Sequence, residues 1–373
     1  MLPEIDLSDP AVLHDPFTVY GRAREQSPVV RLAIPGMSDL LAVTRHAPAR
    51  AVLADPRFEL NERSFLRPPG IPDSCLRYLR TMGEMNGAEH TRQRRVTAPG
   101  FSVRQADALR DRVQRIVDGF LADLSDPVDL VTDFAARLPM EVICELMGVD
   151  EESRPRWREY GAAISAGYGP AFINAIPEII ESARELISHK KANPADDVLS
   201  SLIAGELTDD ELITLAWHLI LAGQTPGNLI SNAIEVLAAH PDRIGPGMVE
   251  EVLRFCGPQL LTVPRFAVGD VEVDGVVIPD GAAVTIAIGA ASRDPRFFAR
   301  PDEFDPARGG IGHLSFAHGP HFCLGASLAR VQTEIALLSL FREFPGLKVG
   351  TGVRAPDGGT WRLSSLPAVI GDR

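Results

Sequence analysis

The chain has 373 residues, of which 45% are hydrophobic and 23% charged, and these proportions are typical of a globular protein rather than a disordered or coiled-coil one. The net charge of −13 argues against general nucleic-acid binding, because phosphate affinity comes mainly from cationic contacts. The sequence holds no membrane-spanning apolar run, and Glu4, Asp6 and Asp9 stand where a signal peptide would be basic. We therefore expect a cytoplasmic protein whose four cysteines are reduced.

The elements predicted along the chain indicate a mainly α fold with small β-sheets. Short apolar runs within residues 1–60 predict a hairpin after a short helix, and a second strand-rich patch covers 261–288. Apolar spacing at helical intervals predicts helices over 106–124, 131–147, 176–190 and 326–342. No repeat or linker divides the chain. We expect residues 1–373 to form a single domain, with a β-rich lobe at about 25–60 and 261–290 and a helical lobe at about 88–255 and 323–345.

The longest predicted helix begins at a capping box formed by Thr208 and Glu211 and continues to Ala239, where a His-Pro pair stops it. It would hold about 31 residues and measure about 46 Å at 1.5 Å per residue. Because it is apolar nearly all round, we expect it to cross the middle of the protein. Pro226 has no N–H to donate, so the helix should kink there and leave a polar notch.

One cysteine, Cys323, has the sequence surroundings of a site. It follows a loop and immediately precedes the last helix, with Gly319 and Gly325 on either side. The N–H groups at the start of a helix favour an anion, here a thiolate. The other cysteines have neither flanking glycines nor zinc-ligand spacing, so we expect packing roles for Cys75, Cys144 and Cys256.

The segment around this cysteine resembles the haem-binding signature of the cytochrome P450 family, with its residues at Phe316, Gly319, Cys323 and Gly325. Two further segments resemble the Glu-x-x-Arg helix and the haem-propionate helix of that family, at Glu251–Arg254 and His90–Arg95 respectively. The matches follow the expected order from about residue 5 onward and are similar to soluble bacterial members. The resemblance implies the cytochrome P450 fold, with the long helix lying over a haem b cofactor.

The resemblance also implies roles for individual residues. Cys323 would be the axial thiolate ligand of the haem iron, a ligand that favours O–O cleavage, and Phe316 and Gly325 would belong to the loop that holds the cofactor. The anionic haem propionates need cationic or donor partners, which would be His90, Arg94, Arg265 and His321. In the family the pair corresponding to Glu251 and Arg254 is buried and braces the loop before the cysteine, with either Arg308 or His313 as a third partner.

The long helix departs from the family pattern where it should line the oxygen pocket. The family usually carries an acid followed by a Thr, a pair that relays protons, whereas the stretch from Ala222 to Pro226 has no carboxylate and is one residue short. Counting from the helix start puts Pro226 at the alcohol position and Thr225 at the acid position. Counting back from the end of the helix puts Thr225 at the alcohol position and Gln224 at the acid position. We favour the second count, because it keeps a hydroxyl and an amide at the pocket.

We therefore expect a haem-thiolate monooxygenase that inserts one oxygen atom from O2 into a mostly apolar organic molecule in bacterial secondary metabolism. No flavin or iron–sulfur module is fused to the chain, so electrons would come from NAD(P)H through an external ferredoxin and its reductase, docking near Arg92, Arg95 and Arg330. We expect a monomer without nucleic-acid or membrane partners. Because the acid is missing, an alternative is an atypical haem-thiolate enzyme that uses peroxide, substrate-assisted proton delivery or oxidative coupling. A haem-binding role without catalysis is a third alternative.

The substrate itself cannot be read from these patterns. In the family it is contacted by the loop at about 62–85, the region at about 165–185, and strand residues near Leu260, Leu261 and Val263. In this chain the first two segments carry a set of large apolar side chains: Phe65, Leu66, Leu76, Leu79, Met82, Tyr168 and Phe172. They indicate a largely apolar ligand.

Overall fold

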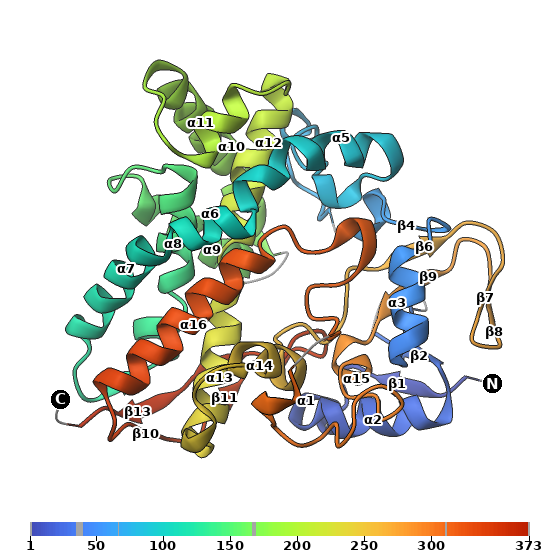
Figure 1. Ribbon diagram of the computed structural model, residues 1–373. Coiled ribbons are helices and arrows are strands. Elements are labelled where there is room, and N and C mark those ends of the chain that lie inside the picture. The colour runs from blue at the N-terminus through green and yellow to red at the C-terminus, as the bar shows by residue number, and fades with distance from the viewer. Residues whose placement is uncertain (1, 35–39, 66, 166–168, 310–311, 372–373) are drawn as a thin grey trace.

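A computed structural model describes residues 2–34, 40–65, 67–165, 169–309 and 312–371 of the chain. Most helices gather on one side and the largest sheet lies on the other (Figure 1). The helices are α1 (Pro10–His14), α2 (Pro16–Gln26), α3 (His46–Ala54), α4 (Asp73–Leu76), α5 (Gly87–Thr97), α6 (Val103–Ala108), α7 (Arg110–Asp123), α8 (Leu138–Met147), α9 (Arg154–Ser165), α10 (Pro170–Ala192), α11 (Val198–Ile203), α12 (Asp209–Ala222), α13 (Pro226–Ala239), α14 (Met248–Cys256), α15 (Ile288–Ala291) and α16 (Ala326–Glu343). No helix in these ranges is long and apolar enough to cross a membrane.

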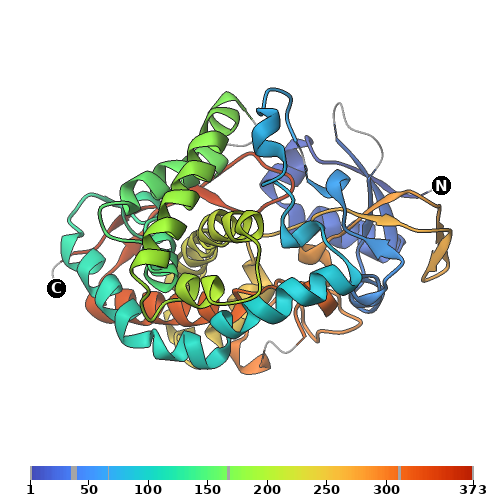
Figure 2. The same ribbon diagram turned by 90° about the horizontal axis from the view of Figure 1, so that it is seen from above.

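The predicted central helix is present but is broken rather than merely kinked. The capping box at Thr208 is confirmed, and α12 begins directly after it. The helix stops at Ala222, and α13 begins with Pro226 at its first position, where the absence of an N–H is tolerated. A side chain at Gly223 would lie only 2.5 Å from Ile143 of α8, so the helix passes unusually close to α8 at this point. Figure 2 shows the two helices at the centre of the molecule.

The predicted strand-rich patches combine into one six-stranded sheet with the order β1-β2-β3-β9-β6-β4. Its strands are β1 (Glu4–Asp6), β2 (Val29–Ala33), β3 (Leu40–Val43), β4 (Phe58–Glu59), β6 (Arg265–Ala267) and β9 (Ala283–Ile286). The hairpin is confirmed by the antiparallel pairing of β2 with β3, and β3 pairs in parallel with β9. The sheet therefore joins segments that are more than half the chain apart.

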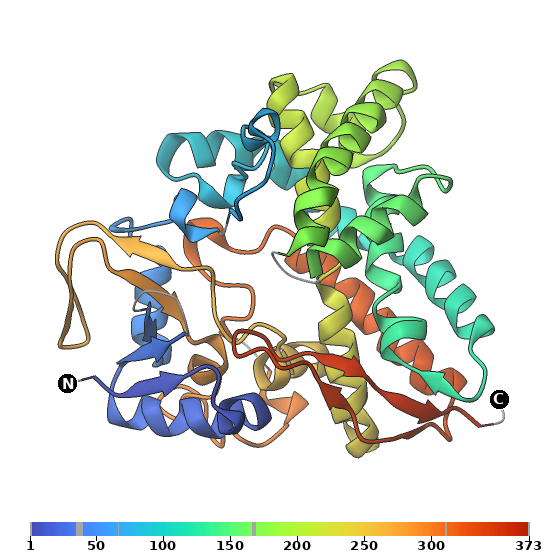
Figure 3. The ribbon, with the colours of Figure 1, turned by 180° about the vertical axis from the view of Figure 1, so that it is seen from behind.

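Three smaller sheets complete the fold. One has the order β10-β13-β5 and brings the end of the chain beside residues 128–129, a pairing that the sequence did not predict. Figure 3 shows the C-terminal strands running beside α13. The strands of these sheets are β5 (Val128–Asp129), β7 (Val271–Val273), β8 (Val276–Ile278), β10 (Lys348–Val349), β11 (Val353–Arg354), β12 (Leu363–Ser365) and β13 (Pro367–Val369).

Two predicted helices are divided in the structure, and two are confirmed. The segment 106–124 forms α6 and α7, separated at Leu109, and the segment 131–147 forms a π-helical turn, η4 (Val131–Ala135), followed by α8. The carboxylate of Asp129 accepts the N–H of Val131 at 2.9 Å and so holds the start of that turn outside a regular helix. The segment 176–190 lies within α10, and the segment 326–342 matches α16 to within one residue.

The buried Glu251–Arg254 pair holds the long loop that follows α15. Both side chains are fully buried, and Arg254 donates to the two carboxylate oxygens of Glu251 at 2.8 and 2.7 Å. Arg254 also donates to three backbone carbonyls, those of Ser292, Pro301 and Glu303. The third partner is Arg308, whose Nε lies 3.5 Å from Glu251, whereas His313 contacts the neighbouring Glu250.

Candidate active site

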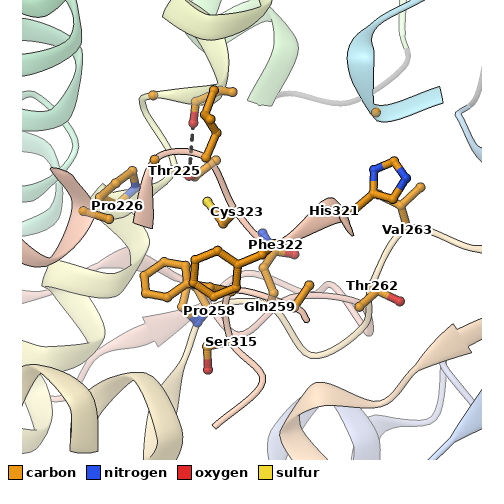
Figure 4. A pocket seen from close by; sticks show the side chains of 18 of the residues that line it. Thr225, Pro226, Pro258, Gln259, Thr262, Val263, Ser315, His321, Phe322 and Cys323 are labelled. Carbon is orange, nitrogen blue, oxygen red and sulfur yellow. Dashed lines mark hydrogen bonds between the residues drawn. The ribbon is translucent and has the colours of Figure 1, made fainter. Parts of the chain in front are cut away.

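A cavity of about 510 Å³ lies where the α12–α13 break faces the loop before α16. Its volume is in the range of small-molecule sites. The described lining is mostly apolar and includes no carboxylate. Figure 4 shows the sulfur of Cys323 in this opening, with Thr225 and Pro226 on one side and Pro258 and Phe322 on the other.

Cys323 is presented to the cavity by a tight loop. Its N–H donates to the carbonyl of Phe316 at 2.9 Å, which closes the loop around the side chain. Gly319 adopts a φ of 76°, and a side chain there would approach the backbone of Leu53 to 2.9 Å, so only glycine fits. Burial raises the pKa of the Cys323 thiol, while a hydrogen bond from the Gly325 backbone and nearby arginines act in the opposite direction. The thiol is the one cysteine side chain of the four that is exposed to open space.

The other three cysteines are buried and free, as predicted. All three lie in the large hydrophobic cluster of the helical lobe. Burial raises the pKa of Cys144 and of Cys256 to about 12, so both stay protonated. These thiols are packing residues, and unlike Cys323 none of them lines the cavity.

The four predicted propionate partners come from three separate segments and gather beside the cavity. The rings of His90 (α5) and His321 (the loop before α16) lie 4.1 Å apart between centroids. Arg265, from β6, has a buried Nε without a hydrogen-bond partner among the described residues, and Arg94 donates to the carbonyl of Phe322. Except for Arg94, these side chains line the cavity directly.

This cluster is electrostatically incomplete. Burial lowers the pKa of Arg265 to about 10. Burial, followed by the nearby His90, Arg265 and Arg94, lowers the pKa of His321 to about 3. Within the described ranges no carboxylate pairs with any of the four, although buried cations are normally paired. An anionic group in the cavity would supply the missing partner, and the two carboxylates of a haem fit this place, with a thiolate donor at the cavity floor. The site is therefore of the haem-thiolate class.

Comparisons with known proteins agree with this class. The family model described as Cytochrome P450 matches residues 246–359. The 6-deoxyerythronolide B hydroxylase of Saccharopolyspora erythraea is 36% identical, with 97% of this chain and 96% of the relative covered. Cytochrome P450 monooxygenase PikC of Streptomyces venezuelae is 37% identical, with 89% and 85% covered. The chain belongs to the cytochrome P450 family and is a monooxygenase, and this membership implies a haem iron cofactor.

Solved structures give the same result for the fold. The tirandamycin C-bound P450 monooxygenase TamI has a TM-score of 0.87 at 30% identity, covering 99% of this chain and 100% of that one. CYP154C4 from Streptomyces sp. W2061 has a TM-score of 0.87 at 31% identity, covering 100% and 98%. The predicted cytochrome P450 fold is therefore confirmed.

The two residues predicted to deliver protons both lie in the helix break, but their side chains point to different places. Thr225 lines the cavity, and its hydroxyl donates to the carbonyl of Ala222 at 3.1 Å, replacing the bond that Pro226 cannot make (Figure 4). Gln224 differs from the prediction, because its amide points away and donates to the carbonyl of Gly161 in α9 at 3.3 Å. The hydroxyl is thus at the pocket and the amide is not, since α9 offers an acceptor that the sequence does not reveal.

The arginines suggested for partner docking are mostly engaged. Arg92 pairs with Glu211, and Arg330 pairs with Glu250, which also accepts from His313 at 3.1 Å. Burial raises the pKa of Glu250, but these two partners outweigh it and lower the value to about 2. Arg95 is exposed and makes no ion pair within the part of the chain that the structure describes.

Some of the residues predicted to contact the substrate line the cavity. Phe65, Met82, Leu261 and Val263 do so, whereas Leu76, Leu79, Phe172 and Leu260 are not part of the lining. Leu66 and Tyr168 lie outside the described residues. The sequence did not single out three polar lining residues, His218, Gln259 and Thr262. His218 precedes Ala222 by one helical turn, and this i,i+4 spacing was the signal that could have found it.

Proposed function

We propose that Cys323 is the axial thiolate ligand of the haem iron and that His90, Arg94, Arg265 and His321 hold the haem propionates. The observation that carries this proposal is the cluster of these four side chains, of which His90 and Arg265 are buried; it lacks any described anionic partner and lies beside the only cysteine that lines the cavity. Phe316 and Gly325 line the same wall and keep the backbone close to the sulfur. In the proposed site, the haem propionates supply the anionic partners that the described residues do not provide.

When bound, a thiolate-ligated haem supplies the activation of O2 for insertion of one oxygen atom into an organic molecule. The residues of the chain provide positioning and proton control. Thr225 is proposed to hold a proton at its Oγ1 beside the cavity, where the helix break brings this hydroxyl within reach of a small ligand. Because no carboxylate lines the described cavity, water or a substrate hydroxyl would pass protons to Thr225.

The proposed substrate is a mostly apolar bacterial secondary metabolite. The lining of the cavity is dominated by leucine, phenylalanine and other apolar side chains, which suit such a ligand. The relative named 6-deoxyerythronolide B hydroxylase and the tirandamycin C-bound monooxygenase TamI support the same class of compound.

Electrons are proposed to come from NAD(P)H through an external ferredoxin and its reductase. Arg95 is the exposed cation that remains available for docking beside the cysteine loop, since Arg92 and Arg330 are engaged in ion pairs. We propose that the enzyme works as a monomer and as a single domain.

The reduced carbon-monoxide difference spectrum tests the haem assignment. The wild-type protein should show the thiolate-type red shift, Cys323→His should bind haem without it, and Cys75→Ser should behave as the wild type. A Cys323→His protein that keeps the thiolate-type spectrum would rule out this ligand.

Turnover tests the reaction. Product should form with NADH, ferredoxin and reductase. Efficient turnover with peroxide alone, and none with the electron-transfer proteins, would instead favour the peroxide-driven alternative that the missing acid keeps open.

A further inference from the structure

His218 is one of the few polar residues in the mostly apolar lining of the cavity. It lies in α12 and lines the cavity together with its neighbours Leu219 and Ala222. Its Nδ1 is fully buried and has no hydrogen-bond partner, and the structure records no bond for its other ring nitrogen within the described ranges. The ring contacts the indole of Trp217 edge-on at 5.7 Å between centroids, a contact that leaves both nitrogens unsatisfied.

The chemistry of this imidazole defines what it can bind. Burial alone lowers the pKa of His218 to about 4, so the ring is neutral near pH 7. A neutral imidazole offers one N–H donor and one acceptor nitrogen. It therefore suits an uncharged hydroxyl or carbonyl oxygen better than a cation or a second carboxylate.

No described side chain of the cavity lining makes a hydrogen bond to this ring. The lining includes no carboxylate, and the polar side chains Thr225 and Gln259 make no hydrogen bond to it. Buried polar groups in folded proteins nearly always have a partner. The ring lines the cavity, so a molecule bound there is placed to supply a partner.

The position of the ring relative to the reaction site is set by the central helix. His218 lies in α12, one helical turn before its last residue Ala222, and Thr225 lies in the break that follows. Thr225 marks the part of the cavity facing Cys323 (Figure 4). A group bound by His218 would thus lie well away from the atom that is oxidised.

We propose that His218 is a specificity-determining residue that hydrogen-bonds a hydroxyl or carbonyl oxygen of the substrate, remote from the carbon that is oxidised. This inference rests on the proposed function of the cavity as the haem-thiolate site. It narrows the substrate from an apolar molecule to an apolar molecule that carries an oxygen atom away from its reacting carbon.

N-alkylimidazoles provide a direct test with the haem-loaded enzyme. Their imidazole coordinates the haem iron, so their tails must extend past Thr225 into the cavity. Two series of increasing length are compared by optical titration, one ending in a hydroxyl and the other in a methyl group. At one tail length the hydroxyl compound should bind the wild type more tightly than its methyl partner, and His218→Phe should weaken that compound alone by about tenfold.

Matched variants separate hydrogen bonding from cavity shape. His218→Gln should restore part of the lost affinity, and Phe65→Leu, an apolar change in the same wall, should affect both series equally. Equal effects of His218→Phe on both series at every length, or no hydroxyl preference in the wild type, would overturn the proposal. If His218→Phe fails to load haem, the proposal is decided by two other results. These are the preference of the wild type for the hydroxyl compound over its methyl partner, and the affinity of His218→Gln for the same two compounds.

Failure of the proposed function gives a different result. In that case the wild type would show neither the thiolate-type carbon-monoxide spectrum nor a spectral shift with any N-alkylimidazole.

Discussion

Replacing Glu251 by Gln removes one charge from the most completely buried ion pair in the described chain. Both Glu251 and Arg254 have fully buried side chains, and the guanidinium makes two bonds to the carboxylate. The carboxylate also accepts the backbone N–H of Asp305 at 2.8 Å. The variant keeps the shape of the side chain but leaves the Arg254 charge buried without a counter-ion.

The expected loss of unfolding free energy is large because the acceptors that remain for Arg254 are neutral. Arg254 would keep three backbone carbonyls as partners, and these solvate its charge without neutralising it. Breaking a buried pair by removing one partner typically lowers the free energy of unfolding by about 3–5 kcal/mol. The loop tied by these carbonyls leads to Cys323, so a weakened loop should also reduce the yield of haem-loaded protein.

Guanidinium unfolding followed by far-UV circular dichroism measures this loss. The matched control is Glu303→Gln, because Glu303 forms an i,i+3 pair with Arg300 in which the side chains are 57% and 66% exposed. That control should change the stability by less than about 0.5 kcal/mol. Equal losses in Glu251→Gln and Glu303→Gln would refute the argument that burial, rather than spacing, gives the pair its strength.

Three further predictions concern other parts of the chain. Glu250 has a pKa of about 2, so its ion pairs stabilise the fold above the ordinary carboxyl pKa of 4.5 and lose that effect as the pH falls towards 2. Glu250→Gln should therefore flatten the pH dependence of urea unfolding in that window by about 1–3 kcal/mol. Gly227→Ala should destabilise by about 1–3 kcal/mol, because the new carbon would lie 2.7 Å from the carbonyl of Ala135, whereas Gly119→Ala, which meets nothing, should stabilise by about 0.5–1 kcal/mol in the same assay. Thr225→Val should divert NADH consumption into hydrogen peroxide and lower product formation about tenfold or more, and unchanged coupling would exclude a proton-holding role.

The parts of the fold that the sequence predicts correctly are those governed by local rules. The start of α16 follows from the loop and glycine before it, and the start of α12 follows from its capping box. Cys323 could be singled out for the same reason, because the residues that present its thiol are within a few positions of it. Its three buried counterparts lacked these neighbours and are indeed packing residues.

The errors arise where distant segments decide the outcome. The central helix breaks where Gly223 packs against Ile143, and Gln224 turns to the carbonyl of Gly161. Both contacts are with helices far away in the sequence, and no periodicity encodes them. The sheet formed by β5 and the C-terminal strands was missed for the same reason.

Two of the residues that line the cavity and hold an unsatisfied polar atom require different ligands. Arg265 lies beside the cysteine loop with a buried Nε that lacks a partner, and it requires an anion. His218 lies in the central helix with a neutral ring, and it requires an uncharged oxygen. Leaving such a buried group without a partner costs about 1–3 kcal/mol. Cofactor binding and substrate binding would each supply one of these partners, and each should make the chain more stable than it is alone.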